Sequence, residues 1–374
     1  MPKFRLATFN VENMFERPKI MNLANWAAGK PVLDDYARLN SLFNQAAYSA
    51  ADKAEMLKLL KRNKLDRQDA SAYLILRKVR GEFIKRPKGK PAEIVATRRT
   101  DWVGWVELVP DAVTEAATEN TARVFQEVGA DIIGVVEAED RVALQHFNDQ
   151  LIPFIGGQPY DHVMLVDGND ERGIDVGLMT RSNFPIVSIC SHVDDRDADG
   201  KRLFSRDCPE YEISLPGGAT LWILANHLKS KGYGKQADSD ARRKAQAARV
   251  REIYEAHRTA GHKLLAVIGD FNDTPESDAL SPLLKSGSDL RDVSTHPNYQ
   301  DDGRPGTYAN GTASGKIDFI LLSPALFGAV KQAAVMRKGV WGGKNGTLWS
   351  HFPTMAGPKD AASDHAALWV DLDF

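Results

Sequence analysis

The stretch LLAVIGDFN, residues 264–272, is the part of the chain that decides the fold. Five apolar residues, 264–268, predict a strand buried on both faces. Gly269 follows them, and then come two polar side chains, Asp270 and Asn272. In extended backbone, residues i and i+2 point the same way, so Asp270 and Asn272 are expected to face one site at the end of the strand.

Several other predicted strands end in polar side chains in the same way. They are 4–9, followed by Asn10 and Glu12; 131–136 (DIIGVV), followed by Glu137; and 221–225, followed by Asn226 and His227. The order is reversed near the C-terminus, where Asp318 lies at the start of the strand 317–322 and Ser363-Asp364-His365 precedes the strand 366–372. If these last two strands run antiparallel to the others, all the polar groups meet at one edge.

The number of strands relative to helices indicates the fold class. Further strands are predicted at 163–166, 176–180 and 211–214, whereas helices are predicted at 115–128, ended by Gly129, and at 240–259. Rossmann folds and barrels alternate strands with helices, and this chain does not. The pattern favours an α/β fold in which two mixed sheets pack face to face with helices outside them.

The predicted edge site has a composition that suits one kind of chemistry. Glu137, Asp270, Asp318 and Asp364, with Glu12 beside them, would repel one another unless their pKa values rise or a divalent cation neutralises them. Oxygen ligands favour Mg²⁺ or Mn²⁺ over zinc. Two histidines among the acids indicate phosphoryl chemistry, because imidazolium stabilises charge on a phosphate oxygen, and an aspartate such as Asp270 can activate water.

The formal net charge of −2 hides an uneven distribution. Residues 16–110 hold 19 Lys/Arg and 11 Asp/Glu, a local net charge of +8, while the remainder of the 374 residues has a net charge of −10. The window 53–99 contains 15 Lys/Arg and 5 Asp/Glu, and Trp102 and Trp105 follow it. This basic segment is either an arm that neutralises nucleic-acid phosphates or an amphipathic helical hairpin with its charges turned to solvent.

Local signals in the basic segment predict helices. Ser49 and Asp52 form a capping-box pattern for a helix that runs to Asn63. Asp69 could cap a second helix over 70–80 that ends at Gly81. Residues 16–48 show no clear period, and strands are predicted at 93–96 and 102–109.

Six short motifs, taken in order along the chain, carry a resemblance to a known family. They are Thr8-Phe9-Asn10-Val11, Glu137 after a buried strand, His227 in Asn-His-Leu-Lys-Ser, Gly269-Asp270-Phe271-Asn272, Ile317-Asp318-Phe319 and Ser363-Asp364-His365. The set resembles the endonuclease/exonuclease/phosphatase superfamily, which has the DNase I-like fold. The resemblance implies a single catalytic domain over 1–374, built as a four-layer α/β sandwich, with 16–110 as a basic, partly helical insertion.

The resemblance also implies roles for the matching residues. Glu137 would be the principal metal ligand with Asn10 beside it, and Asp364 would be a second contact to metal or water. Asp270 would orient or deprotonate the attacking water, Asn272 would help to hold phosphate or metal, and His227 would stabilise the pentacovalent state or assist the leaving group. His365 would contact the scissile phosphate, and Asp318 would hold its tautomer. Glu12 is a further candidate metal ligand.

Three residues are candidates for contact with substrate phosphate: Arg172, Asn226 and Lys229. For Arg172 the alternative is a salt bridge with Asp175. Many family members carry Asn two residues before the first histidine, and here that position is Ala225. The family also places its first Asn and its Glu a few dozen residues apart, whereas Asn10 and Glu137 are separated by 127 positions because of the insertion.

Other features carry weaker expectations. Asp195, Asp197 and Asp199 resemble the first half of a calcium loop, but the twelfth position is Arg206, so a tight acidic turn is the alternative. Cys190 and Cys208 could form one bridge or be two reduced thiols. We find no signal peptide and no apolar run long enough for a membrane span, so a cytoplasmic location is the default expectation. The oligomeric state is left open.

These observations lead to one principal functional hypothesis and two alternatives. The principal hypothesis is a phosphodiesterase that uses one or two Mg²⁺ or Mn²⁺ ions to hydrolyse nucleic acid, with DNA favoured over RNA. The first alternative is a phosphatase or phospholipase for a smaller ester such as a phosphoinositide or sphingomyelin. The second is a non-catalytic nucleic-acid-binding protein. Gly315-Lys316-Ile317-Asp318 lacks the Trp-Cys-Asp-Arg signature of inositol phosphatases, and residues 11–14 lack the Asp-Gly-Leu-Arg run of apurinic endonucleases.

Overall fold

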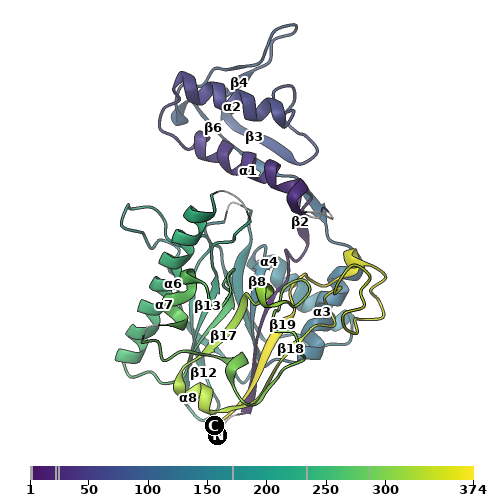
Figure 1. Cartoon of the computed structure of the whole chain (residues 1–374), viewed down its shortest axis with the longest axis vertical. Helices are drawn as coiled ribbons and strands as arrows, with labels where there is room; N and C mark the ends of the chain where they lie inside the picture. Colours follow the sequence, from purple (N-terminus) through teal and green to yellow (C-terminus); the bar gives the residue numbers. More distant parts are fainter. Residues whose placement is uncertain (1–2, 22, 24–25, 171, 233–234, 286) are drawn as a thin grey trace. The chain divides into compact units, whose positions relative to one another are not determined.

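The computed structural model describes residues 3–21, 23, 26–170, 172–232, 235–285 and 287–374 (Figure 1). The chain divides into two compact units. Unit 1 comprises residues 1–15, 113–231 and 237–374, and unit 2 comprises residues 16–112 and 232–236. The bounds of unit 2 lie within a few residues of the basic segment 16–110. No described helix combines the length and the apolar character needed to cross a membrane.

Unit 1 is built on two mixed β-sheets. The first sheet has the strand order β16 (Tyr299–Gln300), β18 (Val330–Met336), β19 (Ala367–Asp373), β1 (Lys3–Asn10), β8 (Ile132–Ala138), β10 (Asp175–Thr180) and β9 (His162–Val166). The second has the order β11 (Ile186–Cys190), β12 (Glu210–Ser214), β13 (Thr220–His227), β14 (Leu265–Asp270), β17 (Asp318–Leu322) and β15 (Arg291–Asp292). In the centres of these sheets β1 is parallel to β8, and β13 is parallel to β14.

The two strands expected to run in the opposite direction do so. β17 pairs antiparallel with β14, and β19 pairs antiparallel with β1. The start of each antiparallel strand therefore lies beside the end of its neighbour. This topology confirms the prediction that the polar groups of the early and late motifs reach one edge.

The two sheets pack face to face around an apolar interior. Alternate residues of the central strands fill it, among them Leu6, Ile132, Ile223, Ile268 and Ile320. Gly134 allows the sheets to come close, because a Cβ atom there would lie 2.7 Å from Cδ1 of Ile268. Each fully buried side chain of this kind contributes about 1.5–3 kcal/mol to stability.

Helices cover the outer faces and complete four layers (Figure 1). The first sheet is covered by α3 (Glu115–Val128), α4 (Arg141–His146) and α5 (Ile152–Phe154), and the second by α6 (Gln236–Thr259) and α7 (Ser281–Leu284). The short α8 (Pro324–Gly328) follows β17. Thr114 caps the start of α3, and Gly129 ends it in the left-handed conformation at φ 56°. The predicted α/β sandwich of two mixed sheets is confirmed.

Unit 2 has a separate apolar core. Helices α1 (Trp26–Phe43) and α2 (Ala50–Arg62) pack with the hairpin of β3 (Leu74–Gly81) and β6 (Trp102–Leu108) and with the short pair β4 (Ile84–Lys85) and β5 (Glu93–Ile94). The rings of Phe43, Phe83 and Trp102 meet at its centre. The strands β2 (Glu16–Pro18) and β7 (Pro110–Ala112) pair where the chain enters and leaves this segment.

The helix predicted over 70–80 is wrong, although the one over 49–63 is confirmed. Ser49 and Asp52 form the expected capping box of α2. Residues 74–81 instead form β3, which pairs with β6. Leu74 and Leu76 are buried two positions apart, a strand period, and Asp69 pairs with Arg86 and Lys78 rather than capping a helix. The tertiary pairing with β6 outweighs the weak helix-start signal.

Helix α1 was not predicted, because its first turns contain Gly29 and Pro31. Both residues are unfavourable inside a helix and hide the pattern. Beyond them Leu33, Tyr36 and Leu39 are buried at helical spacing.

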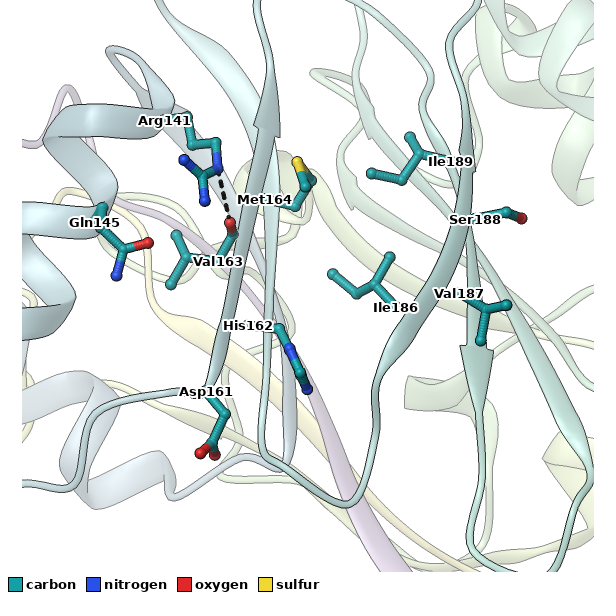
Figure 2. A pocket seen from close by; sticks show the side chains of 10 residues that line it. All are labelled: Arg141, Gln145, Asp161, His162, Val163, Met164, Ile186, Val187, Ser188 and Ile189. Carbon is teal, nitrogen blue, oxygen red and sulfur yellow. Dashed lines mark hydrogen bonds between the residues drawn. The ribbon is translucent and has the colours of Figure 1, made fainter.

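Between the edge strands β9 and β11 of unit 1 lies an open cavity of about 460 Å³ (Figure 2). Its lining includes Arg141, His162 and Ile189, and none of the motif residues contributes to it. This cavity is therefore separate from the candidate site.

Candidate active site

The second sheet brings His227, Asp270 and Asp318 together by register. His227 is the parallel neighbour of Asp270, and Asp270 lies opposite Asp318 in the antiparallel pair. All three continue the alternation of residues that face the interior between the sheets, as Ala225, Ile268 and Ile320 do. All three are at most 3% exposed. These three polar side chains therefore lie side by side at one edge of the apolar interior.

The first sheet contributes Asn10 and Glu137. The Asn10 amide donates to Oδ2 of Asp270 across 3.1 Å. Glu137 has φ 69°, in the left-handed region that is unusual for a side chain other than glycine. Strand alternation would turn Glu137 toward the outer helices with Val135, but the left-handed backbone breaks that alternation. Its Oε1 instead lies 3.6 Å from Nε2 of His227 in the other sheet.

His365 is held by Asp318 and Thr307. Its Nδ1 lies 2.8 Å from Oδ2 of Asp318, and the Thr307 hydroxyl donates to the same oxygen across 2.5 Å. The other ring nitrogen, Nε2, is 4.0 Å from Oδ2 of Asp270 and 3.7 Å from Oδ1 of Asp364. Asp318 therefore fixes the ring so that Nε2 faces the acidic group.

The two histidines are driven to opposite charge states. Burial, with the positive charges of Arg206 and Arg172, lowers the pKa of His227 well below its ordinary value, so the ring is neutral. Burial would also lower the pKa of His365, but the attraction and hydrogen bond of Asp318 outweigh it and raise the pKa well above the ordinary value. The site thus combines a neutral imidazole with an imidazolium.

The pKa of Asp270 is strongly affected by its surroundings. Burial and the neighbouring charge of Asp318 raise its pKa to about 7. Its Oδ1 accepts a hydrogen bond of 2.8 Å from the backbone of Asn272, which has φ 55°. A carboxylate with a pKa near neutrality can exchange a proton with water under physiological conditions, as a general base requires.

The donor set fits a divalent cation. Ligand atoms of Glu137, His227 and Asp270 all lie within 4.8 Å of one another. Burial and the charge of Asp318 raise the pKa of Asp270, so its ionised form is disfavoured unless a positive charge lies beside it. A hard divalent ion would supply it, with oxygen ligands from Glu137 and Asn10.

The loops after β1 and before β19 are joined beside this group. Ser363 Oγ donates to the Asn10 carbonyl across 2.7 Å, and the backbone of Asp364 donates to Oε2 of Glu12 across 2.9 Å. Glu12 has φ 52°, a third left-handed residue near the site after Glu137 and Asn272. Such conformations cost about 1–3 kcal/mol each and cluster at functional sites. The carboxylate of Glu12 thus orders the loop that carries His365.

The three candidate phosphate contacts have different surroundings. Asn226 is fully buried on the other face of β13, where its amide donates to the Leu224 carbonyl, so we do not retain it as a site residue. Arg172 pairs with Asp170 rather than forming the alternative salt bridge with Asp175. Lys229, two residues after His227, has its pKa lowered to about 7 by burial and by Arg206 and Arg172.

Several residues at the site carry no signal in the sequence. Arg206 is 2% exposed, and its Nε lies 2.8 Å from Oδ2 of Asp170. Arg172 forms an ion pair with the same carboxylate. Because both arginines depress the pKa of His227, their positive charge acts at the site. The Tyr308 ring packs on His365 with centroids 4.9 Å apart. No local motif marks these residues, since each arrives through a loop contact.

The acidic segment at Asp195, Asp197 and Asp199 forms a tight turn rather than a calcium loop. Oδ1 of Asp197 accepts from the backbones of Asp199 and Lys201, as in a tight turn, and Asp195 pairs with Arg249. Within the described part of the chain, these three carboxylates do not form a cluster that could hold a metal ion. Both cysteines are free thiols, which rules out the bridge between Cys190 and Cys208.

Comparisons with known proteins agree with this architecture. Residues 112–338 match the model of the endonuclease/exonuclease/phosphatase family. A family protein of that name from Bacteroides thetaiotaomicron is 19% identical, with a TM-score of 0.50 over 69% of this chain and 86% of that chain. A mannosyl-6-phosphatase from the same species is 20% identical, with a TM-score of 0.49 over 69% and 92% of the two chains.

The catalytic domain of human nocturnin is 18% identical, with a TM-score of 0.48 over 70% of this chain and 87% of that chain. No curated protein matches the sequence. The family model covers more than half of the chain. The protein therefore belongs to the endonuclease/exonuclease/phosphatase family of phosphoester-hydrolysing enzymes.

Proposed function

We propose that the protein hydrolyses phosphodiester bonds of nucleic acid, with DNA as the favoured substrate, and depends on Mg²⁺ or Mn²⁺. The observation that carries this proposal is the meeting of Glu137, His227 and Asp270 from two sheets, next to the Asp318–His365 pair. Acid, neutral imidazole and imidazolium in one buried group are the components that in-line attack of water on a phosphate needs.

Each side chain has a definite task in this proposal. Glu137 and Asn10 would hold the cation, with Asp364 and Glu12 near it, and the bound ion would neutralise charge on the phosphate. Asp270 takes the proton of the attacking water, and Asn272 keeps the Asp270 carboxylate oriented through its backbone N–H.

The two histidines act on different parts of the phosphate group. His365, charged and fixed by Asp318, donates from Nε2 to a phosphate oxygen. His227, neutral, is placed to donate toward the pentacovalent state or the leaving group. The positive charge of Arg172 and Arg206 acts beside His227 and favours an anionic substrate.

The preference for nucleic acid rests on unit 2. The net charge of +8 over residues 16–110 is much larger than a surface for a small monoester requires. Lys88 and Lys90 are exposed in the turn between β4 and β5. Many other basic side chains there are paired, such as Arg77 with Glu107 and Arg38 with Glu55, so this turn is the most promising contact with phosphates.

The proposal is tested with plasmid DNA and bis-p-nitrophenyl phosphate as parallel substrates, in Mg²⁺ or Mn²⁺. We expect both to be cleaved, and we expect EDTA or His365→Ala to abolish both reactions. Cleavage of the small diester alone would shift the substrate to a smaller ester such as a phosphoinositide or sphingomyelin. Binding of DNA without turnover would favour the non-catalytic alternative.

Charge reversal in the basic turn tests the role of unit 2. We expect Lys88→Glu/Lys90→Glu to reduce kcat/KM for DNA by roughly 10-fold at low salt, because each lost phosphate contact also removes counterion release. The rate with the small diester should stay unchanged. If DNA cleavage by the variant depends less on salt concentration than cleavage by the wild type, direct contact between the basic turn and DNA phosphates is supported.

The matched control reverses two exposed lysines of unit 1. Lys263 precedes β14 and Lys331 lies at the start of β18, both at the strand ends opposite to the site. Lys263→Glu/Lys331→Glu makes the same change in net charge. If it slowed DNA cleavage as much as the unit 2 variant, the effect would be one of total charge and the basic turn would have no specific role.

A further inference from the structure

Unit 1 contains a second group of potential metal ligands, outside the active site. Cys190 and Glu210 lie opposite each other in the antiparallel pair of β11 and β12, and His192 follows β11 by two residues. The ligand atoms of these three residues lie within 4.8 Å of one another. The group shares no residue with the clusters around Asp270.

Helix α6 brings a second histidine, His257, to the carboxylate of Glu210. Nε2 of His192 lies 2.5 Å from Oε1 of Glu210, and Nε2 of His257 contacts the other oxygen of the same carboxylate. Strand alternation explains this meeting, because Tyr211 and Ile213 face the interior while Glu210 faces the covering helix. The side chains of Glu210, His192 and His257 are between 9% and 12% exposed, whereas Cys190 is exposed and leaves the group open to ions.

The surrounding residues hold His192 in the orientation that a metal ligand needs. Its Nδ1 lies 3.0 Å from Oδ2 of Asp195, and Asp195 is fixed in turn by Arg249 at 2.7 Å. Oδ1 of Asp207 accepts the backbone N–H of His192 across 2.7 Å. Histidines that bind metals characteristically give their second ring nitrogen to a carboxylate, which directs the first toward the ion.

We propose that this group binds a Zn²⁺ ion through Sγ of Cys190, a ring nitrogen of His192 and a carboxylate oxygen of Glu210, with a fourth position for water. One thiolate, one imidazole and one carboxylate are ligand types that zinc takes, and water completes a tetrahedral set. His257 holds the other oxygen of Glu210 and so positions this ligand. Binding displaces the thiol proton of Cys190 and the proton that His192 shares with Glu210.

The chemistry distinguishes this ion from the one in the active site. Thiolate and imidazole select a borderline-soft ion, whereas Glu137 and Asn10 suit a hard one. The zinc proposal does not depend on the proposed nuclease function, because it concerns different residues and is read out without turnover.

Co²⁺ titration of the EDTA-treated full-length protein is the direct test. We expect a sulfur-to-cobalt charge-transfer band and tetrahedral d–d bands that saturate at one ion per chain and disappear when Zn²⁺ is added. Cys190→Ser should abolish the charge-transfer band. Because Cys190 is exposed, this variant should fold, as circular dichroism would verify.

Two further variants distinguish this zinc site from the metal site of the active centre. Glu137→Gln changes a proposed ligand of the active-site ion and leaves the surroundings of Cys190 unchanged. The charge-transfer band of this variant should therefore equal that of the wild type. Asp195→Asn leaves all three protein ligands in place but loosens His192, and it should weaken Zn²⁺ binding about 10- to 100-fold in competition titrations. No charge-transfer band in the wild type, or a band that survives Cys190→Ser, would overturn the proposal.

Discussion

Asp270→Asn is expected to lower kcat by roughly 10³-fold on both DNA and bis-p-nitrophenyl phosphate, since general-base catalysis contributes about 10²–10⁴-fold. The amide has nearly the shape of the carboxylate but cannot take a proton from water. Oδ1 can still accept the backbone hydrogen bond of Asn272. The loss should therefore appear in kcat, while KM stays close to that of the wild type.

The same substitution is expected to stabilise the metal-free protein. Folding raises the pKa of Asp270 from 3.8 to about 7, so the ionised side chain destabilises the folded state. The penalty is absent below pH ~4, grows as the pH rises, and is complete above pH ~7, where it reaches at most roughly 4 kcal/mol. The amide of Asn10 loses its acceptor in the variant, which costs about 1 kcal/mol.

Urea unfolding at pH 8 in EDTA measures this effect, and we expect a gain of about 1–3 kcal/mol in the free energy of unfolding. The gain should vanish at pH 4. The matched control is Asp292→Asn, a buried aspartate of the same sheet that pairs with Lys316 at 2.8 Å. It should destabilise the protein and leave kcat unchanged. A destabilised Asp270→Asn protein would mean that the site lacks the proposed excess of negative charge.

Gly269→Ala is expected to cost the largest amount of stability. Gly269 has φ 127°, a conformation that is accessible almost only to glycine, and an added Cβ would lie 1.9 Å from the carbonyl oxygen of Asn226 in β13. Relief of this contact requires β13 and β14 to separate next to Asp270. We expect a loss of about 4 kcal/mol or more in the free energy of unfolding, with loss of activity.

Gly200→Ala provides the comparison. Gly200 also has positive φ, at 77°, but nothing lies within 4 Å of a Cβ placed there. That variant should lose only about 1–2 kcal/mol, the cost of the left-handed backbone. Differential scanning calorimetry of the two variants separates the steric clash from the backbone cost. Equal losses would show that the two strands can separate without difficulty.

Much of unit 1 could be predicted because its strands carry strong local signals. Residues 265–268 of the apolar run and 132–136 of DIIGVV are buried on both faces, and the polar residues follow at the ends of these strands. Alternation within a strand also predicts that Asp318 and Asp270 face the same side as the apolar interior. These signals depend only on neighbours in the chain.

Unit 2 shows where such signals fail. The segment 74–81 has a capping residue before it and no turn signal inside it. It forms a strand by pairing with β6, which lies more than 20 residues further along the chain. Helix α1 contains Gly29 and Pro31 in its first turns and depends on packing in the core around Phe43. Propensity is a weak guide when tertiary contacts supply most of the stabilisation.

The sequence by itself determined which residue types are available at the strand ends: Asn10, Glu137, His227, Asp270 and His365 are all readable as motifs. Only the tertiary structure decided the charge states of these side chains and the directions in which they point. Glu137 reaches His227 because its backbone is left-handed, and His365 is charged because Asp318 pairs with it in a buried place. Burial and distance set both properties, and both depend on residues that are far apart in the chain.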